Sequence, residues 1–313
     1  MTIRLLNQLE SLRTNLPENA PLLLKELAQS IQYTIYSSEL KEVVELYKKE
    51  KSPSSYIIDK YDYLFRCIHL ELIRGLLSHI YILDVCRTAH RIAISKGFCC
   101  RPEMTEAMDL SITGFVHPFT EGGRMNDWKM TNGNNICILT GSNMAGKSTT
   151  LKAITISVWL AHCGLPVPAR SMTSPVFDGI YTSINLPDSL RDGRSHFMAE
   201  ILRIKEVLQK AKSGKRCLII LDEMFRGTNA QDAFEASIAV NELLRKYPHC
   251  SFLISTHILE YAKHFEKDNT CCFYYMDSRI EDDQFIYPYQ LLEGISEAQV
   301  GYWLVKKELE GLI

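Results

Sequence analysis

The sequence "ILTGSNMAGKSTTLKAI" at residues 138–154 joins a short apolar run to a helix-forming segment through a glycine-rich loop. Gly141, Gly146, Lys147 and Ser148 satisfy the pattern G-x-x-x-x-G-K-[ST], which is typical of a phosphate-binding loop. Its glycines allow the backbone to curl so that successive N–H groups point inward, and the following helix adds its positive end. The stretch therefore predicts a strand, a phosphate-binding loop and a helix rather than an ordinary glycine turn.

The residue types in this loop suit a nucleoside triphosphate with a magnesium ion. Lys147 is expected to reach the β and γ phosphates, and the hydroxyl of Ser148 to bind Mg²⁺. The loop alone does not distinguish a kinase, a GTPase or an ATPase, but with the motifs described next we expect ATP and Mg²⁺ as ligands. The residues predicted to contact the nucleotide are Gly141, Ser142, Asn143, Met144, Ala145, Gly146, Lys147, Ser148 and Thr149.

A second motif, "CLIILDE" at residues 217–223, is an apolar run that ends in two acids. It predicts a buried strand whose carboxyl end carries both carboxylates, which is where ligands of open α/β sheets bind. We expect Asp222 to support Mg²⁺ and Glu223 to orient and deprotonate the attacking water. The alternative is an acidic helix cap after a core strand.

A third apolar run, "SFLISTHILE" at residues 251–260, places His257 just after a strand. A histidine here can donate a hydrogen bond to the γ phosphate. A lone histidine in such a place is ordinarily a satisfied surface or core residue. Because it follows a phosphate-binding loop and an acid pair, the prediction is that His257 takes part in catalysis with Lys147 and Glu223.

The apolar runs are too short and continuous for amphipathic helices, and they alternate with helical stretches. Alternation of this kind predicts an α/β fold with a mostly parallel sheet flanked by helices over residues 101–313. Near the end, "TCCFYYMDSRI" and "DQFIYPYQLL" predict an antiparallel pair, followed by a helix from about Ser296. The helical stretches lie at 148–163, 197–212 and 231–246.

The first part of the chain, residues 1–100, predicts an all-helical region. It has no glycine before Gly75, and apolar residues recur at three- and four-residue spacing in three early segments. The run from Tyr56 to Ser95 predicts one helix of about 40 residues, roughly 60 Å long, with a kink or break at Gly75 as the alternative. The three early segments are 3–14, 21–32 and 39–50.

Composition limits the classes of function. The formal net charge of −2 and the pI near 6.5 provide no global basic field, so any DNA contact must come from a local patch or a partner subunit. The ten cysteines form no C-x-x-C pair and predict buried free thiols in a reducing cytosol. We see no signal peptide and no apolar stretch able to span a bilayer, and expect a cytoplasmic protein without membrane contact.

Four ordered motifs resemble the ATPase domain of the MutS family of DNA mismatch repair proteins. They are "TGSNMAGKSTTLK", "DSLRDGRSHFMAEI", "LDEMFRGTNAQDA" and "STHILE", and the likeness runs from about residue 80 to the end, including "LLEGISEAQVGYWLVKKELEGL". The resemblance implies a P-loop NTPase of the ABC-like MutS type. It also implies an ATP-hydrolysing homodimeric switch that binds mismatched or branched DNA in repair or recombination control.

The resemblance further implies that two nucleotide domains face each other across the ATP sites. Ser195, in "RDGRSHFM", would then reach the γ phosphate bound by the partner subunit, and so act in trans. Asn143 would touch the γ phosphate, and Arg226 would couple the site to the opposite subunit. The alternative is a structural role, in which Ser195 caps the amino terminus of a helix.

Several positions depart from the family pattern. Ser142 replaces a proline, Ala145 replaces a glycine, and Phe225 replaces the usual glycine before Arg226, so that the turn after the acid pair is bulkier. Gly123 occupies the place where relatives often carry an aromatic ring near the adenine. Base stacking by Trp128 or His117 is the substitute that we expect.

Two further observations bear on function. About a hundred helical residues precede the ATPase domain, and no suitable "F-x-E" wedge motif is present, so direct mismatch reading is not expected. Both a shortened paralogue and a fragment of a longer protein stay open.

The alternative function is an ABC or chromosome-maintenance ATPase that acts on protein partners without direct DNA recognition. Such proteins place an L-S-G-G-Q-like signature before the acid strand, where this chain has "GRSHFMAE".

Overall fold

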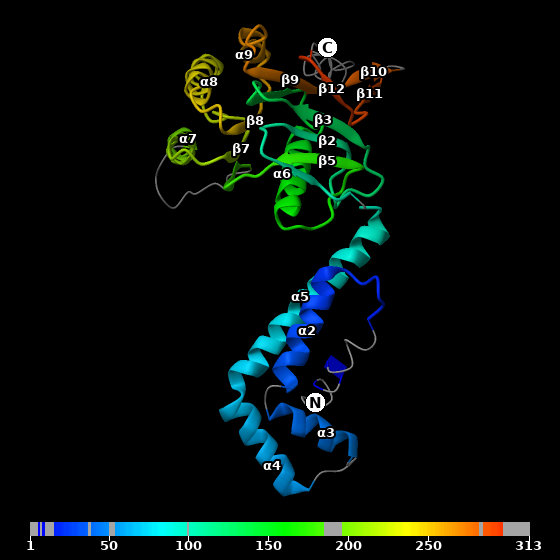
Figure 1. Cartoon of the computed structure of the whole chain (residues 1–313). Coiled ribbons are helices and arrows are strands. Elements are labelled where there is room, and N and C mark those ends of the chain that lie inside the picture. Colours follow the sequence, from blue (N-terminus) through cyan, green and yellow to red (C-terminus); the bar gives the residue numbers. More distant parts are fainter. Residues whose placement is uncertain are drawn as a thin grey trace, which may run out of the picture. The chain divides into compact units, whose positions relative to one another are not determined.

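The structure is a computed structural model that divides into two compact units, residues 1–89 and 90–313 (Figure 1). The described residues are 6, 8–9, 16–36, 39–49, 54–98, 100–184, 196–281 and 284–296.

The first unit is built from helices around a small apolar core. Ile31 and Ile35 from one helix pack with Leu40 and Val43 from the next, and all four are at most 1% exposed. Each such side chain contributes about 1.5–3 kcal/mol by leaving water. The helices are α2 (Leu22–Tyr36), α3 (Leu40–Lys49), α4 (Ser55–Tyr63), a π-helical turn η1 (Leu64–Ile68) and α5 (Leu70–Lys96), which continues into the second unit.

The prediction of one uninterrupted helix from Tyr56 to Ser95 is wrong. The helix breaks at His69 (φ −112°, ψ 25°), whose N–H donates to the carbonyl of Leu64 at 2.8 Å, whereas Gly75 lies inside α5. Leu64 and Leu76 both face the core, at 4% and 2% exposed. In an unbroken helix they would point about 120° apart, so the π turn and the break restore a common apolar face.

The second unit is centred on a six-stranded sheet in the order β12-β9-β4-β8-β7-β6. Four of its five strand pairings are parallel, and only β12 runs antiparallel on β9. The predicted mixed α/β fold with a mostly parallel sheet is therefore confirmed. The strands are β4 (Ile136–Thr140), β6 (Gly179–Ser183), β7 (Cys217–Asp222), β8 (Ser251–Ser255), β9 (Cys271–Met276) and β12 (Leu291–Glu293).

Helices cover both faces of this sheet because alternate residues of the buried strands point to opposite sides. Cys137 and Leu139 of β4 belong to one apolar cluster with α6, whereas Ile136 and Ile138 belong to another with α7, α8 and α9. Figure 1 shows α7, α8 and α9 grouped on one side of the sheet. The helices are α6 (Lys147–His162), α7 (His196–Lys212), α8 (Ala230–Leu244) and α9 (Leu259–His264).

A second sheet, in the order β1-β5-β2-β3, packs on the α6 side. Ile112 of β2 and Met172 of β5 share the first cluster with Leu151 and Val158 of α6. This sheet thus fixes the helix that follows the glycine-rich loop. Its strands are β1 (Glu103–Thr105), β2 (Leu110–Phe115), β3 (Asn126–Met130) and β5 (Ser171–Pro175).

The two apolar stretches near the carboxyl end pair as predicted, but in two separate places. β9 pairs antiparallel with β12, and β10 (Arg279–Glu281) pairs antiparallel with β11 (Gln284–Ile286). The helix predicted from about Ser296 and most of the segment 3–14 lie outside the described residues.

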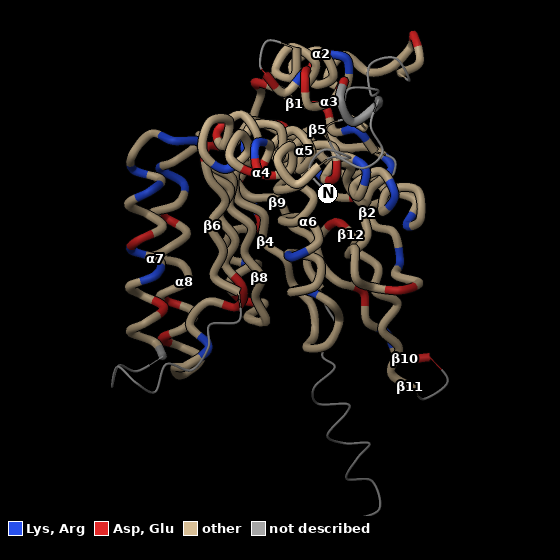
Figure 2. The backbone as a smooth tube through the Cα atoms, turned by 90° about the horizontal axis from the view of Figure 1, so that it is seen from below, with Lys and Arg blue, Asp and Glu red and all other residues tan. Residues whose placement is uncertain are grey.

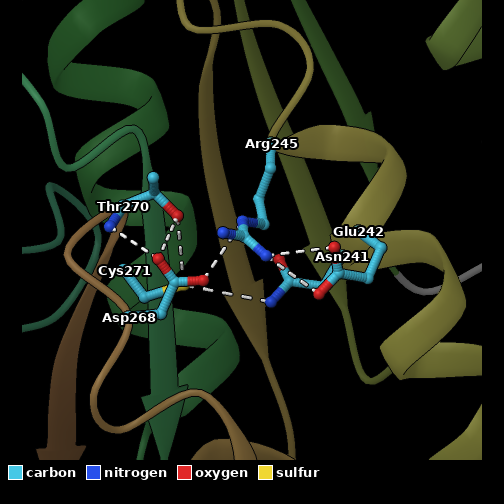
Figure 3. Close-up of polar contacts among 6 residues, drawn as sticks. All are labelled: Asn241, Glu242, Arg245, Asp268, Thr270 and Cys271. Carbon is cyan, nitrogen blue, oxygen red and sulfur yellow. Dashed lines mark hydrogen bonds and ion pairs between the residues drawn. The ribbon is translucent and has the colours of Figure 1, made fainter.

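Charged positions are interspersed along α7 and α8 (Figure 2). One polar cluster fastens the end of α8 to the start of β9 (Figure 3). The guanidinium of Arg245 pairs with Glu242 at 3.0 Å and with Asp268 at 3.1 Å, and Asp268 accepts hydrogen bonds from the N–H and hydroxyl of Thr270. This cluster lies at the amino end of β9, away from the carboxyl ends that carry the candidate site.

The cysteines are free thiols within the described part of the chain, but they are not uniformly buried. Cys67, Cys86 and Cys163 are exposed, so the prediction of burial is wrong for these three. Two of them lie on helices whose solvent face is not strictly polar. No helix among the described residues has the length and apolar composition to cross a membrane. The buried thiols are those of Cys100, Cys137, Cys217, Cys250 and Cys271, and Cys272 is half-buried.

Candidate nucleotide-binding site

The glycine-rich loop connects the end of β4 to the start of α6, as the sequence predicts. Gly141 has φ +139° and Gly146 has φ +102°, in the region that favours glycine. A Cβ added at Gly141 would lie 3.2 Å from the backbone oxygen of Met276, and one at Gly146 would lie 3.3 Å from the ring of Tyr289. Both glycines are therefore needed for backbone conformation and for space.

Lys147 is folded into the loop rather than extended into solvent. Its Nζ donates to the carbonyl oxygens of Gly141 at 2.8 Å and Ser142 at 3.0 Å, and its residue is 4% exposed. Burial lowers the pKa of Lys147, while the charges of Glu223 and Asp222 raise it in part. The lysine thus stands ready at the inner wall of the loop.

The surroundings of Lys147 suit an oxyanion ligand. The first N–H groups of any helix lack intrahelical partners, and here they belong to the start of α6. The hydroxyl oxygen of Ser142 is buried without a hydrogen-bond partner in the described structure. Among the other predicted contacts, Ala145 is buried and Ser148 is half-buried, whereas the exposed ones are Asn143, Met144 and Thr149.

The acid pair stands at the end of β7 and is held by Ser255 of the neighbouring strand β8. The Ser255 hydroxyl donates to Asp222, and the N–H of Glu223 donates to the hydroxyl of Ser255 at 3.0 Å and to its carbonyl at 3.1 Å. Glu223 has φ +52°, which costs a non-glycine residue about 1–2 kcal/mol. Ser255 is a residue that the sequence analysis missed, since nothing in its own neighbourhood marks it.

The carboxylate of Glu223 faces the loop and lies between two cations. Its Oε1 is 3.3 Å from Nζ of Lys147, and its Oε2 is 2.6 Å from Nε of Arg226. The N–H of Arg226 does not point at that oxygen, so this contact is an ion pair without a hydrogen bond. The acid and the lysine are buried, and together with the exposed side chain of Arg226 they form one charge cluster beside the loop.

The other predicted site residues are only partly placed. His257 follows β8 by two residues and is exposed, and it makes no hydrogen bond or ion pair with the rest of the described structure. Ser195 lies outside the described residues, and α7 begins at the next residue. The structure therefore brings together Lys147, Asp222 and Glu223, but not these two.

A cleft of about 700 Å³ opens beside the loop and α6. Its lining includes His117, Gly123 and Tyr289, and burial followed by the charge of Lys152 lowers the pKa of His117. Trp128 is 3% exposed and donates from Nε1 to Cys137, so base stacking by Trp128 is wrong because its ring is used in the core.

Tyr289 is a lining residue that sequence reasoning missed. Asn126 fixes its segment, since the Asn126 amide donates to the carbonyl of Tyr289 at 3.0 Å and accepts from the N–H of Leu291 at 2.8 Å. Met276 also lines the cleft, and its sulfur accepts from the hydroxyl of Thr150. No local sequence pattern links Asn126 to Tyr289 or Thr150 to Met276, because the two members of each pair are more than a hundred residues apart along the chain.

The fold and site define an α/β domain with a glycine-rich loop and an acid pair at the carboxyl edge of its parallel strands. The sequence profile of MutS domain V matches residues 137–308, a range that contains the whole loop and acid pair. This chain belongs to the MutS family.

Individual relatives agree with this assignment. The DNA mismatch repair protein MutS of Shouchella clausii is 32% identical over 250 residues, which are 78% of this chain and 28% of the relative. MutS of Aquifex pyrophilus is 33% identical over 228 residues, 72% of this chain and 26% of the relative. The DNA mismatch repair protein msh3 of Botryotinia fuckeliana is 33% identical over 210 residues, which are 64% of this chain and 18% of the relative. The matches thus span less than a third of the relatives' own lengths.

Proposed function

We propose that this chain is an ATP-hydrolysing, dimer-forming switch of the MutS type that acts on mismatched or branched DNA in repair or recombination control. The observation that carries the proposal is the buried contact between Lys147, at the end of the glycine-rich loop, and Glu223, at the end of β7. A lysine and a carboxylate placed beside free helix N–H groups combine phosphate binding with a base for water. The similarity to DNA mismatch repair proteins supports the biological setting.

In this proposal the loop binds the triphosphate through its backbone N–H groups and Lys147. The lysine must exchange the carbonyl oxygens of Gly141 and Ser142 for phosphate oxygens, which weakens its ion pair with Glu223 and leaves that carboxylate paired with Arg226. Glu223 then takes a proton from the attacking water. The hydrogen bonds from the N–H of Glu223 to Ser255 hold the glutamate in position for this step. Nucleotide binding and activation of the base are thereby linked.

Ser148 and Asp222 are the residues that would hold Mg²⁺. Both supply oxygen ligands, and a Mg²⁺ site with one or two protein ligands completed by water and phosphate is the usual arrangement. The ion, when bound, neutralises negative charge on the phosphate oxygens. Ser255 orients Asp222 for this contact through its hydroxyl.

Two subunits would complete the site. Ser195 of one subunit contacts the γ phosphate bound by the other, while Asn143 and His257 contact it from the same subunit as Lys147. The adenine of the nucleotide lies in the cleft of about 700 Å³, against His117 and Tyr289. A shared phosphate of this kind makes ATP the bridge that closes the dimer and hydrolysis the step that opens it.

The deciding experiment is ATPase activity measured against protein concentration, with and without branched or mismatched duplex DNA. A shared site predicts specific activity that rises with protein concentration, and Lys147→Ala protein should be inactive at every concentration. Specific activity that is constant with concentration would reject the shared site. Stimulation by DNA that weakens steeply with salt supports phosphate-backbone contacts, whereas insensitivity to every duplex supports action on protein partners.

A mixing experiment tests the role of Ser195. In a hybrid of Ser195→Ala and Lys147→Ala subunits, one site carries both defects and the other carries neither. We therefore expect partial recovery of activity on mixing two inactive proteins. Absence of recovery, with hybrid formation verified by native mass spectrometry, would place Ser195 in its own subunit's site or outside the site.

A further inference from the structure

The turn after the acid pair contains a bulky residue in a conformation that glycine prefers. Phe225 has φ +63° and is 3% exposed, and it lies two residues after Glu223. A β-carbon is disfavoured in this region of φ, so the ring must gain enough from its contacts to hold the backbone there. The contacts of this ring therefore show which part of the domain holds the turn after Glu223.

The ring of Phe225 packs against the first turn of α7. Its centroid is 5.5 Å from that of Phe197, with the planes tilted by 56°. This is an ordinary favourable geometry for an aromatic pair. The ring also lines an apolar groove of about 330 Å³ with Ile204 of α7 and Val240 of α8, so it is seated where these two helices meet.

The same turn also carries Glu223, the proposed catalytic base, and its contacts with the charge cluster. The N–H of Glu223 is bonded to Ser255, and the Glu223 carboxylate lies between Lys147 and Arg226, the residue that follows Phe225. Four consecutive residues, 223–226, therefore connect the charge cluster beside the loop to the first turn of α7. The aromatic pair is the part of this connection that reaches α7.

We propose that Phe225 is a positioning residue that, through Phe197, holds the Glu223 turn against the first turn of α7. A displacement of that turn of the helix is then transmitted to the carboxylate beside Lys147. The inference rests on the proposed function for its consequence: α7 begins directly after Ser195, the residue assigned to the partner's phosphate, so the aromatic pair connects one site to the other.

The test combines amide hydrogen exchange without nucleotide with steady-state kinetics. Phe197→Ala removes the ring contact without changing the backbone of the turn. We expect exchange in the peptide covering residues 222–226 to rise and kcat to fall by about two- to tenfold, with KM for ATP unchanged. Phe197→Tyr, which keeps the ring, should restore both. Leu202→Ala, an exposed position of the same helix, is the matched control and should change neither.

Phe225→Gly provides a second variant, because glycine adopts the observed φ without strain. The double variant Phe197→Ala/Phe225→Gly should lower kcat no further than either single variant, since both remove one contact. Unchanged exchange and kcat in Phe197→Ala, or additive losses in the double variant, would overturn the inference. Absence of ATP binding and hydrolysis by the wild-type chain would instead refute the proposed function, and the exchange result, which needs no nucleotide, would still decide whether the aromatic pair holds the turn.

Discussion

The Nζ of Lys147 lies 3.3 Å from Oε1 of Glu223, and their side chains are only 4% and 8% exposed. The cation that the proposal assigns to phosphate and the carboxylate that it assigns to water are therefore direct neighbours in one buried contact. Charges buried together in this way stabilise each other only as a pair, since each alone would bear its full desolvation cost. A triphosphate that captures the lysine thus changes the state of the acid as well.

Replacing the lysine should abolish nucleotide binding. Lys147→Ala removes the buried donor to the phosphates, and we expect a loss of about 2–5 kcal/mol in binding free energy, typical of truncating one member of a buried charge pair. The measurement is isothermal titration calorimetry with ATP and Mg²⁺. Lys246→Ala, which removes an exposed lysine two residues after the end of α8, is the control and should bind as wild type; an affinity of Lys147→Ala equal to that of this control would remove Lys147 from the site.

Replacing the acid should separate binding from turnover. Glu223→Gln keeps the shape of the side chain but not the base, so we expect ATP to bind and hydrolysis to fall by about 10²–10⁴-fold. An ATP-bound dimer should then accumulate, which size-exclusion chromatography with light scattering would detect. Glu242→Gln, which alters a surface ion pair with Arg245, is the control. Turnover by Glu223→Gln equal to that of the wild type would reject this assignment of the base.

The parts of the site that the sequence predicts are those encoded by contiguous residues. The loop between β4 and α6 and the acids at the end of β7 are each defined by a run of fewer than ten residues, and strand alternation then places them at the same edge of the sheet. Because parallel neighbours share their carboxyl ends, β7 and β4 need only flank β8 for the acids to approach the loop.

The remaining features depend on residues that are distant in the sequence. The ring of Tyr289 lies beside Gly146 in a segment that is hydrogen-bonded to the distant Asn126, and Ser255 is identified only by its hydrogen bonds to the acid pair. The break at His69 restores the apolar face of a helix toward a core supplied by other helices, which periodicity along one segment does not contain. The positive φ of Phe225 agrees with the glycine that the family resemblance leads us to expect there, but a single segment of sequence does not show that the ring of Phe197 packs against it.

Stability should depend on pH through Lys147. Burial lowers the pKa of the lysine in the folded chain below its ordinary value of 10.5, so between those two pKa values the unfolded chain binds more protons. Stability contributed at this position therefore rises as pH increases through the window and is constant below the folded pKa.

The comparison for this effect is Lys147→Met, which has no titrating amine. The free energy of unfolding of the wild type, relative to that of Lys147→Met, should increase between neutral pH and pH 10.5 in urea denaturation at a series of pH values. Parallel pH profiles for the two proteins would contradict the lowered pKa.

Two glycines of nearly equal conformation separate backbone strain from crowding at the loop. Gly146 has φ +102° and would bring a Cβ within 3.3 Å of the Tyr289 ring, whereas Gly133 has φ +104° and open space around it. Alanine at either position should cost about 1–2 kcal/mol of stability through the backbone alone. Gly146→Ala should cost more, because the ring must move, and it alone should weaken ATP binding.

The excess cost at Gly146 can be assigned to the ring by a double variant. Tyr289→Ala removes the atoms that the new Cβ would meet, so Gly146→Ala in that background should cost no more than Gly133→Ala in the wild type. Urea denaturation measures the stabilities, and titration with ATP and Mg²⁺ measures the affinities. If the excess cost of Gly146→Ala persists without the Tyr289 ring, the requirement for glycine comes from the loop backbone alone, and the contact with the distant segment around Tyr289 does not shape the candidate site.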